Sequence, residues 1–346
     1  MMELQDPKLK QRGRASLDFL AQLGVASAPV SQKVTSEISD RLDVDNLPDD
    51  LDEREEAIDN ALSDSTAFAT QRLMGDWHSR SHGRISWEAF EEIKPELQPV
   101  LDATTKGPAS LVLDPELKLP AYWEGVHFHR TEGGWDAHEH MGYVHGEIIH
   151  KKMVARFFPG GIFKQRQNVA EMAPRDSYER ILDMGCSSGH FTTALAKTYP
   201  DAQITGVELS ARMLEHAHRT ANANGWNWKL YQRAAENTDF EDASFDLVAS
   251  YILIHEIPAD VVEQVFAEAF RVLEPGGDMI MSDATRYADL DKLSVWKADR
   301  SAKYGGEPFW RETASLDLAE IARKVGFVDV SADGMYPHVV KGRKPA

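Results

Sequence analysis

The pattern of apolar and polar positions divides the chain into parts with different periodicity. Before residue 110, apolar residues recur at three- and four-residue spacing in KQRGRASLDFLAQLG, EREEAIDNALSDSTAFATQRLM and SWEAFEEIKPELQPVL, which predicts amphipathic helices. From about residue 178, short apolar runs alternate with helical segments, and we expect strands at RILDMG, AQITGVEL, WKLYQRA, FDLVAS, GDMIMSD and FVDVSAD. This alternation predicts an α/β fold, in which a doubly wound parallel sheet is covered by helices on both faces.

The segment between these two parts has a different composition. Residues 111–143 are rich in Gly, Pro, His and aromatic residues, which is typical of a connector or of pocket-lining chain. VHGEIIHKKMVARFF predicts a further helix, and Pro159, Gly160 and Gly161 are expected to end it. We therefore expect a helical N-terminal domain at 1–110, a connector or lid at 111–143 and the α/β domain at 144–346.

Composition and charge narrow the class of partner. The 346 residues carry a formal net charge of −18, which disfavours nucleic acid, because phosphate backbones are bound by clustered Lys and Arg. No apolar run of about 20 residues predicts a membrane span, and the first residues lack the apolar stretch of a secretory signal. The lone Cys186 excludes an internal disulfide and fits a reducing, cytoplasmic compartment. Together these features favour a small-molecule substrate.

An acidic run lies in the helical part. Between Glu37 and Asp64 there are twelve acidic residues and two basic ones. A solvated helical surface is the favoured interpretation of this run, and an electrostatic role is the alternative.

The loop after the first strand carries a glycine motif. Residues 183–190 read DMGCSSGH, and a dinucleotide fingerprint would need glycine where Ser187 and His190 stand. The run instead matches Asp-x-Gly-x-x-x-Gly, with the carboxylate of Asp183 inside the end of the strand. An acidic group there suits a ligand that carries an ammonium group rather than a pyrophosphate. The alternative is a glycine turn that serves only the fold.

The second strand ends in an acidic residue as well. Glu208 lies 25 residues after Asp183. A carboxylate at this place can accept hydrogen bonds from both hydroxyls of a ribose. The two loops together predict a nucleoside site.

These pieces resemble a class I methyltransferase that depends on S-adenosylmethionine (SAM). Within that superfamily the region is most similar to the ubiquinone/menaquinone-biosynthesis-like group, the methyltransferase type 11 pattern. The matching pieces are ILDMGCSSGHFT, GVELSARMLEHA, AENTDFEDASFDLVAS, HEIP and RVLEPGGDMIMSD, and the resemblance covers roughly residues 145–343. It implies a Rossmann-like, mostly parallel sheet of seven strands, with SAM as the cofactor.

The resemblance also implies which residues contact the cofactor. Glu208 would hold the ribose, and Tyr251 would lie near the methionine carboxylate or the sulfonium. The residues expected on the methionine side are Asp183, Gly185, Cys186 and Gly189, and those expected around the adenine are Leu209, Met213, Ala235 and Glu236. There are two departures from the pattern. Ser187 replaces the common middle glycine, and Ala234 stands where an Asp often binds the adenine amine, so a backbone group is expected to take over.

Two further loops carry candidate catalytic groups. In YILIHEIP, after the fourth strand, His255 is a candidate general base because a neutral imidazole can accept a substrate proton near pH 7. Glu256 would orient its ring. The alternative is that His255 packs within the fold and Glu256 starts a helix. Arg286, after the fifth strand, could hold an anionic substrate group, with a surface ion pair as the alternative.

Histidines and aromatic residues are concentrated in the connector. Six of the thirteen histidines fall between His127 and His150. Since no known metal motif is reproduced, we assign no metal ligands. Aromatic faces attract a sulfonium cation and cover a flat substrate, so we expect a lid, with packing between the two domains as the alternative. The further catalytic candidates are His129 and His140, and the candidate pocket residues are Tyr122, Phe128, Trp135, Tyr143, Tyr304 and Trp310.

The expected function is methyl transfer from SAM to a small molecule. O- or C-methylation of an aromatic, quinone-like or secondary metabolite is favoured by the aromatic and histidine residues of the connector. S- or N-methylation and a non-catalytic SAM-binding or scaffold role remain alternatives. The glycine spacing disfavours a nicotinamide oxidoreductase, and the acidic charge disfavours a methyltransferase that acts on RNA. The helical N-terminal part is expected to support the lid or to form a homodimer.

Overall fold

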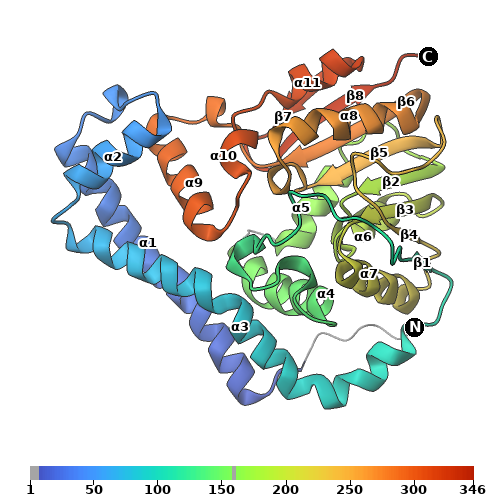
Figure 1. The fold of residues 1–346 in the computed structure, drawn as a ribbon, viewed down its shortest axis with the longest axis horizontal. Helices are drawn as coiled ribbons and strands as arrows, with labels where there is room; N and C mark the ends of the chain where they lie inside the picture. The colour runs from blue at the N-terminus through green and yellow to red at the C-terminus, as the bar shows by residue number, and fades with distance from the viewer. Residues whose placement is uncertain (1–7, 158–160) are drawn as a thin grey trace.

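The computed structural model describes residues 8–157 and 161–346, and Figure 1 shows a layer of long helices beside an α/β core. The helical layer consists of α1 (Gln11–Arg41), η1 (Val44–Asn46), α2 (Leu51–Ala61) and α3 (Thr66–Ala103). The connecting region contains β1 (Ser110–Val112), η2 (Phe128–Arg130), η3 (Gly134–Asp136), α4 (Met141–Tyr143), η4 (Val144–Met153), η5 (Val154–Phe157) and α5 (Gly161–Ala170). The core contains β2 (Arg180–Met184), α6 (His190–Thr198), β3 (Gln203–Glu208), α7 (Ala211–Asn224), β4 (Lys229–Gln232), β5 (Phe245–Tyr251), η6 (Ile254–Glu256), α8 (Ala259–Val272), β6 (Leu273–Asp283), η7 (Tyr287–Asp289), α9 (Lys292–Gly305), α10 (Trp310–Thr313), α11 (Leu318–Val325), β7 (Val328–Asp333) and β8 (His338–Arg343).

The sheet has the doubly wound order that the alternation predicted. Its strands run β1-β4-β3-β2-β5-β6-β8-β7, and all neighbours are parallel except β8, which is antiparallel to β6 and β7. The chain moves outward in one direction from β2 and in the other from β5, so the strand order reverses between these two strands. Ligands of such sheets bind at the carboxyl ends of the strands near this reversal. An apolar cluster lies on each face of the sheet.

Two strands were not predicted from the pattern. One is β8, which lies antiparallel between β6 and β7. In the described residues the sheet thus has eight strands where the resemblance implied seven. The other is β1, residues 110–112, which pairs parallel to β4 at the sheet edge. Its place is fixed by the side chain of Asn222 in α7. The Asn222 Oδ1 accepts the amide hydrogen of Ala109 at 3.0 Å, and its Nδ2 donates to the carbonyl of Thr104 at 3.0 Å. Such a tertiary contact leaves no periodic signal in a three-residue strand.

The N-terminal segments are helical as predicted, but their boundaries differ. α1 continues past Gly24, and the helix expected at 53–74 is divided into α2 and the start of α3. α3 is a single helix of 38 residues that also covers the helix expected at 86–101. Ser65 separates α2 from α3, because its Oγ accepts the amide hydrogen of Phe68 at 3.0 Å and caps the first turn. α1, α3 and η4 bury one apolar cluster, which includes Leu17 and Phe90.

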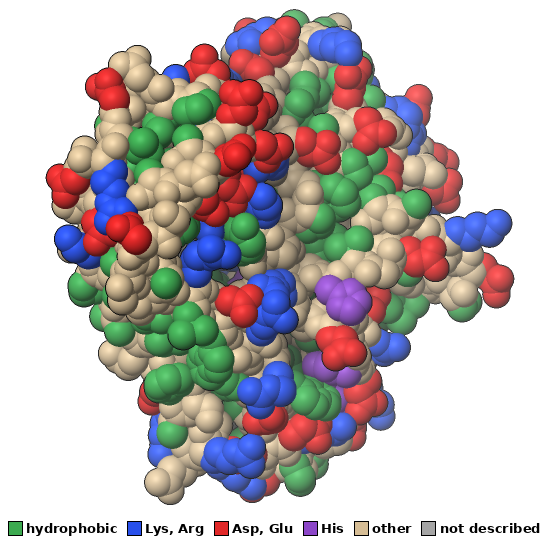
Figure 2. Space-filling view, turned by 60° about the vertical axis from the view of Figure 1, so that its left-hand side comes forward, with side chains coloured by type: hydrophobic (Ala, Val, Ile, Leu, Met, Phe, Trp, Pro, Cys, Tyr) green, Lys and Arg blue, Asp and Glu red, His purple; other side chains and the backbone are tan. Residues whose placement is uncertain are grey.

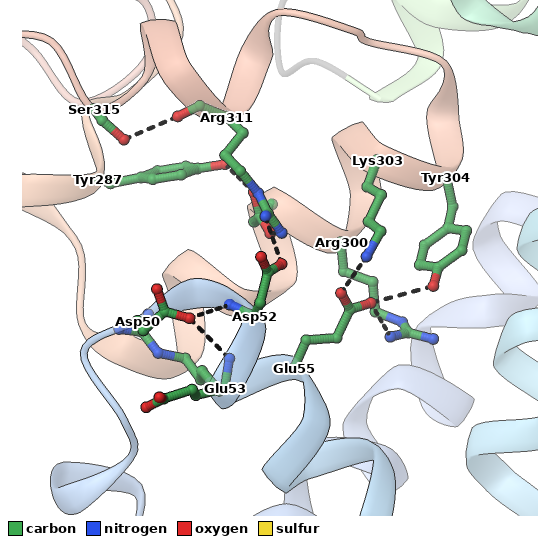
Figure 3. Close-up of polar contacts among 12 residues, drawn as sticks. Asp50, Asp52, Glu53, Glu55, Tyr287, Arg300, Lys303, Tyr304, Arg311 and Ser315 are labelled. Carbon is green, nitrogen blue, oxygen red and sulfur yellow. Dashed lines mark hydrogen bonds and ion pairs between the residues drawn. The ribbon is translucent and has the colours of Figure 1, made fainter.

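Polar contacts join the helical layer to the segment around α9 and α10 (Figure 3). Glu55 of α2 accepts hydrogen bonds from Arg300 Nη1 at 2.9 Å, from Lys303 Nζ and from Tyr304 Oη at 3.2 Å. Arg311 of α10 donates to Asp52 at 2.6 Å. Part of the acidic run at residues 37–64 is therefore not simply a solvated surface. Its side chains form ion pairs with basic side chains of α9 and α10, which is the electrostatic role that the sequence left as the alternative.

The helix predicted at 144–158 begins as expected but is mainly a π-helix, η4. Of the expected stop, Pro159 and Gly160 lie outside the described residues, and Gly161 is the first residue of α5. η4 packs against α7: a Cβ on Gly146 would lie 3.2 Å from the ring of His216, and His216 Nε2 lies 3.3 Å from Glu147 Oε1. π-Helices are rare and occur frequently at functional sites. Here η4 supplies two residues of a cavity described below.

On the face drawn in Figure 2, acidic and basic side chains are interspersed and do not form a large patch of one charge sign. Among the described residues, no helix combines the length and apolar character needed to cross a bilayer.

Candidate functional site

Most of the predicted site residues meet in one cavity of about 330 Å³. It lies at the carboxyl ends of β2, β3 and β5, beside the reversal of strand order. Predicted residues that line it are His129, His255 and Glu256 among the catalytic candidates; Gly185, Glu208, Leu209, Met213, Ala235, Glu236 and Tyr251 among the cofactor candidates; and Tyr122, Trp135 and Trp310 among the aromatic candidates.

The glycine turn after β2 forms one wall of this cavity. Gly189 has φ 84°, and a Cβ there would lie 3.0 Å from the ring of Trp228, so glycine is required where α6 begins. Ser187, which replaces the expected middle glycine, has φ 47°. A non-glycine residue in this left-handed region costs roughly 1–2 kcal/mol. Ser187 therefore adopts the left-handed conformation that a glycine would take at this position, and its backbone is strained.

Glu208 is held in place by two backbone amides. Its Oε2 accepts from the amide of Ser187 at 3.1 Å and its Oε1 from the amide of Ser210 at 2.9 Å. Burial raises the pKa of Glu208 to about 7, although both amides favour the ionised form. The carboxylate keeps lone pairs for further donors, so it can accept hydrogen bonds from the hydroxyls of a bound ribose.

Asp183 lies beneath the cavity instead of lining it. Its side chain is fully buried, its Oδ2 accepts from Thr192 Oγ1 at 2.6 Å, and its Oδ1 has no donor among the described residues. Burial raises the pKa of Asp183 to about 7. Cys186 and Gly189 do not line the cavity either. Cys186 is buried against Gly206 of β3, where a Cβ would lie 2.8 Å from its Sγ, and burial raises the pKa of its thiol.

The region expected to hold the adenine is covered by the connector. Tyr122 Oη donates to Glu236 Oε1 at 2.7 Å, so residues 114 positions apart form one wall. Burial raises the pKa of Tyr122, and the nearby Glu236 raises it further. The hydroxyl of Tyr122 therefore stays protonated and acts as a hydrogen-bond donor. Leu209 and Met213 supply apolar lining.

A buried arginine that the sequence analysis missed reaches the same cavity. Arg166 of α5 is 9% exposed, its guanidinium lies 4.6 Å from the ring centre of Tyr251, and its Nη1 donates to the carbonyl of Ile162 at 3.2 Å. No ion pair with a carboxylate is formed by Arg166 within the described part of the chain. Beside it, Tyr251 Oη donates to Gln165 Oε1 at 2.8 Å. The segment KQRQNV carries no motif, so only its position in α5 reveals Arg166.

His255 lies where predicted, but its charge state differs from the predicted one. Its Nδ1 is 2.8 Å from Asp283 Oδ1, and its Nε2 is 3.6 Å from Glu256 Oε1. Burial by itself lowers the pKa of His255, but the two carboxylates outweigh burial and raise the pKa well above 6.5. An imidazolium has no lone pair that can accept a proton. The expectation of a neutral general base at His255 is therefore corrected to an ion-paired imidazolium.

His129 bridges two carboxylates from different parts of the core. Its Nδ1 lies 2.6 Å from Glu307 Oε1, and its Nε2 lies 3.3 Å from Glu256 Oε1. Burial opposes protonation, but Glu307 and Glu256 raise the pKa of His129 to about 10. One ligand atom from each of these three residues lies within 4.8 Å of the others. While both ring nitrogens of His129 act as donors, however, the imidazole offers no lone pair to a metal ion.

Five predicted residues are placed elsewhere and are corrected here. Phe128 and Tyr143 are buried in apolar packing, and His140 packs against Phe90 with ring centres 5.0 Å apart. Arg286 Nη1 pairs with Asp317 at 2.7 Å, which is the alternative that the sequence left open. Tyr304 contacts Glu55, outside the cavity. Composition identifies an aromatic segment, but not which of its side chains point inward. Cavity residues missed by the sequence analysis include Gln165, Arg166, Arg233, Ile252, Glu307 and Tyr336.

Comparison with known proteins agrees with this geometry. Residues 181–277 match the family described as methyltransferase domain. The chain is 34% identical over 152 residues to malonyl-(acyl-carrier protein) O-methyltransferase of Legionella pneumophila, covering 43% of this chain and 48% of that protein. It is 32% identical over 169 residues to the ubiquinone/menaquinone biosynthesis C-methyltransferase UbiE of Desulfotalea psychrophila, covering 44% of this chain and 66% of that protein.

A solved structure shows similarity at lower identity. Phosphoethanolamine N-methyltransferase 2 of Haemonchus contortus, in complex with SAM, aligns with a TM-score of 0.49 and 18% identity, covering 66% of this chain and 61% of that chain. The chain thus spans about half to two thirds of the length of these relatives. The sheet order, the glycine turn, the carboxylate of Glu208 and the family match lead to one assignment. The chain contains a class I SAM-dependent methyltransferase domain, and SAM is the cofactor of that domain.

Proposed function

We propose that the protein transfers a methyl group from SAM to a small molecule, by O- or C-methylation of an aromatic, quinone-like or secondary metabolite. One observation carries this proposal. The same cavity holds a carboxylate fixed by two amides, Glu208, and a buried guanidinium without a carboxylate partner among the described residues, Arg166. These groups complement the ribose hydroxyls and the methionine carboxylate of SAM.

Each residue of the cofactor side has a binding task. Glu208 accepts from the ribose hydroxyls, and Arg166 donates to the carboxylate. The unpartnered Oδ1 of Asp183 attracts the ammonium group from beneath the glycine turn. The ring of Tyr251, stacked on Arg166 and tied to Gln165, fixes the guanidinium. When bound, SAM supplies a methyl group that is already activated on a sulfonium sulfur.

The protein's contribution to rate is then mainly alignment and exclusion of water. Holding the reacting groups in line can contribute about 7–11 kcal/mol. Trp135 and Trp310 line the cavity, and Trp135 Nε1 donates to Glu256 Oε2 at 3.3 Å, so the connector is anchored to the core loop after β5. The relatives named above include an O- and a C-methyltransferase, so similarity to them does not select the acceptor atom.

Calorimetry and product analysis test the proposal. The full chain, stripped of copurified compounds, should bind S-adenosylhomocysteine (SAH), and Glu208→Ala should weaken binding by about tenfold or more, because hydrogen bonds to a charged group contribute about 1.5–3 kcal/mol. Glu215→Ala, on the neighbouring helix α7, is the matched control and should bind normally. Incubation with SAM bearing an isotopic methyl label and cell extract should then yield a labelled small molecule by mass spectrometry. Absence of SAH binding would refute the proposal.

We also propose a homodimer through the helical N-terminal part and a cytoplasmic location. Phe19, Val25, Leu73 and Trp77 of α1 and α3 are 40–72% exposed. The rings of Phe19 and Trp77 are in edge-to-face contact with centres 5.6 Å apart, and adjoining apolar side chains on a surface favour association. Sedimentation of the full chain should show a dimer that Leu73→Glu dissociates, whereas a monomeric wild-type protein would contradict it. The location is supported by the single, buried Cys186, which fits a reducing compartment.

A further inference from the structure

A second cavity of about 380 Å³ adjoins the cofactor cavity, and we call it the second chamber. Trp135, His145, Glu307 and Trp310 line both cavities, so the two share a wall. The other walls come from α3 of the helical layer, from η4 and from α9, and Figure 1 shows α9 between the helical layer and the core. A volume of this size is in the range of small-molecule sites. The second chamber can therefore hold a compound next to the cofactor.

The second chamber offers no positive charge to an anion. Among the described residues, no lysine or arginine lines it. Burial lowers the pKa of His82 to about 4 and of His145 to about 3, and it also lowers the pKa values of His78 and His150, so these imidazoles are neutral at pH 7. The charged groups that remain are Glu307 and the imidazolium of His129, which are paired with each other. An anionic compound would lose its hydration without a compensating partner.

The shared wall is aromatic and held in a fixed orientation. The ring of Trp135 meets that of His145 edge to face, with ring centres 4.5 Å apart, and Trp310 meets His255 in the same way at 4.8 Å. Ile149 and Met153 of η4 add apolar surface. Rigid aromatic and apolar walls of this kind favour a flat, apolar body with few polar groups.

Glu307 has one carboxylate oxygen available for a ligand. Its Oε1 accepts from His129 Nδ1 at 2.6 Å, whereas its Oε2 is buried and has no hydrogen-bond donor among the described residues. Buried carboxylate oxygens are normally paired with donors. Because Glu307 lines both cavities, a donor supplied by a compound in the second chamber would complete its hydrogen bonding at the boundary with the cofactor cavity.

We propose that the second chamber binds the methyl acceptor, and that the acceptor is an uncharged, flat molecule whose hydroxyl donates to Glu307. This inference rests on the methyl transfer proposed above. Transfer forms the bond between the acceptor oxygen and the methyl carbon and breaks the bond between that carbon and sulfur, whose electron pair stays on sulfur. The hydroxyl proton passes to the Glu307 carboxylate. A cation and an anion are thereby converted into a neutral thioether and a neutral carboxylic acid, so charge is balanced.

Binding of three probes to the SAH-loaded full chain tests the inference. 2-Naphthol is the neutral flat phenol, 2-naphthoate is its anionic counterpart, and 2-methoxynaphthalene lacks the hydroxyl hydrogen. Calorimetry should show 2-naphthol binding about tenfold or more tightly than either of the others, because a hydrogen bond to a charged acceptor contributes about 1.5–3 kcal/mol. In Glu307→Gln the preference over 2-methoxynaphthalene should largely disappear.

A pair of variants on α9 tests the location. Ala298 lines the second chamber, and its exposed neighbour Lys297 does not. Ala298→Phe should reduce 2-naphthol binding at least tenfold and leave SAH binding unchanged, whereas Lys297→Phe should change neither. Glu307→Gln preserves the shape of the side chain and keeps the test valid if Ala298→Phe disturbs folding.

Three results would overturn the inference: 2-naphthoate binding as tightly as 2-naphthol, no naphthol binding at all, or full naphthol binding in an SAH-competent Ala298→Phe protein. Loss of SAH binding by the wild-type chain would instead refute the proposed function, so the two failures are distinguishable.

Discussion

The two buried carboxyl groups of the cofactor site should make ligand binding depend on pH. Burial raises the pKa values of Asp183 and Glu208 to about 7. Below pH 7 both are therefore largely protonated in the ligand-free protein. Ribose hydroxyls and an ammonium group favour ionised acceptors, so binding of SAH should release the protons that these two carboxyl groups carry.

The magnitude follows from the two pKa values. A carboxyl group with a pKa of about 7 is roughly 10% ionised at pH 6 and roughly 90% ionised at pH 8. SAH affinity should therefore rise about tenfold per carboxyl group between these pH values, or about a hundredfold for both, and about two protons should be released per ligand at pH 6. Calorimetry in buffers of different ionisation enthalpy measures both quantities.

Single variants assign the protons. Glu208→Gln and Asp183→Asn should each reduce the release at pH 6 by about one proton, and comparison with the wild type cancels any titration of the ligand itself. Since these folded-state pKa values are raised above the unfolded values, the ligand-free protein should lose stability from these groups as pH rises from about 4 to about 7. An affinity that stays constant from pH 6 to pH 8, without proton release, would refute the reasoning.

Three further predictions concern residues around the site. Ser187 has φ 47°, a conformation that glycine adopts freely and a β-branched residue does not. Ser187→Gly should therefore keep or raise the melting temperature, whereas Ser187→Val should lower the free energy of unfolding by about 1–2 kcal/mol. Equal melting temperatures of the two variants would contradict this. His255→Phe should cost about 3 kcal/mol in urea unfolding, because buried Asp283 loses its charged partner, whereas Glu256 keeps His129 and Trp135. Because the pKa of His255 is raised, its contribution should be fully present below pH 6.5 and lost as pH rises through the higher folded value; a variant as stable as the wild type would show that the ion pair with Asp283 does not form. Glu55→Ala should cost about 1.5–3 kcal/mol, since Lys303 and Tyr304 lose their acceptor and Arg300 keeps only Asp59 among the described residues, and should speed limited proteolysis of the helical layer. Exposed Glu56→Ala should have no effect, and identical behaviour of the two variants would count against the network in Figure 3.

The local features of the cofactor side were determined by the sequence. The alternation of strands and helices predicted the doubly wound sheet, because its periodicity follows from burial on two faces. The glycine turn and Glu208 were predicted because backbone geometry and hydrogen-bonding capacity belong to residues at fixed short spacing. The cavity at the carboxyl ends of β2 and β3 contains Gly185 and Glu208 as expected from that reasoning. Their contact with SAM stays a prediction.

Only the tertiary structure decided which side chains line the two cavities and how their groups are charged. His255 is charged because Asp283, 28 residues later, lies 2.8 Å from it. Glu307 likewise lies next to His129, although most of the core's sequence separates the two residues. Arg166 was invisible in the sequence because burial, not a motif, makes it a candidate ligand group. Phe128 and Tyr143 have the same composition signal as Trp135 but point into apolar packing. Protonation and exposure depend on neighbours brought together from distant segments, and the order of residues along the chain does not contain those distances.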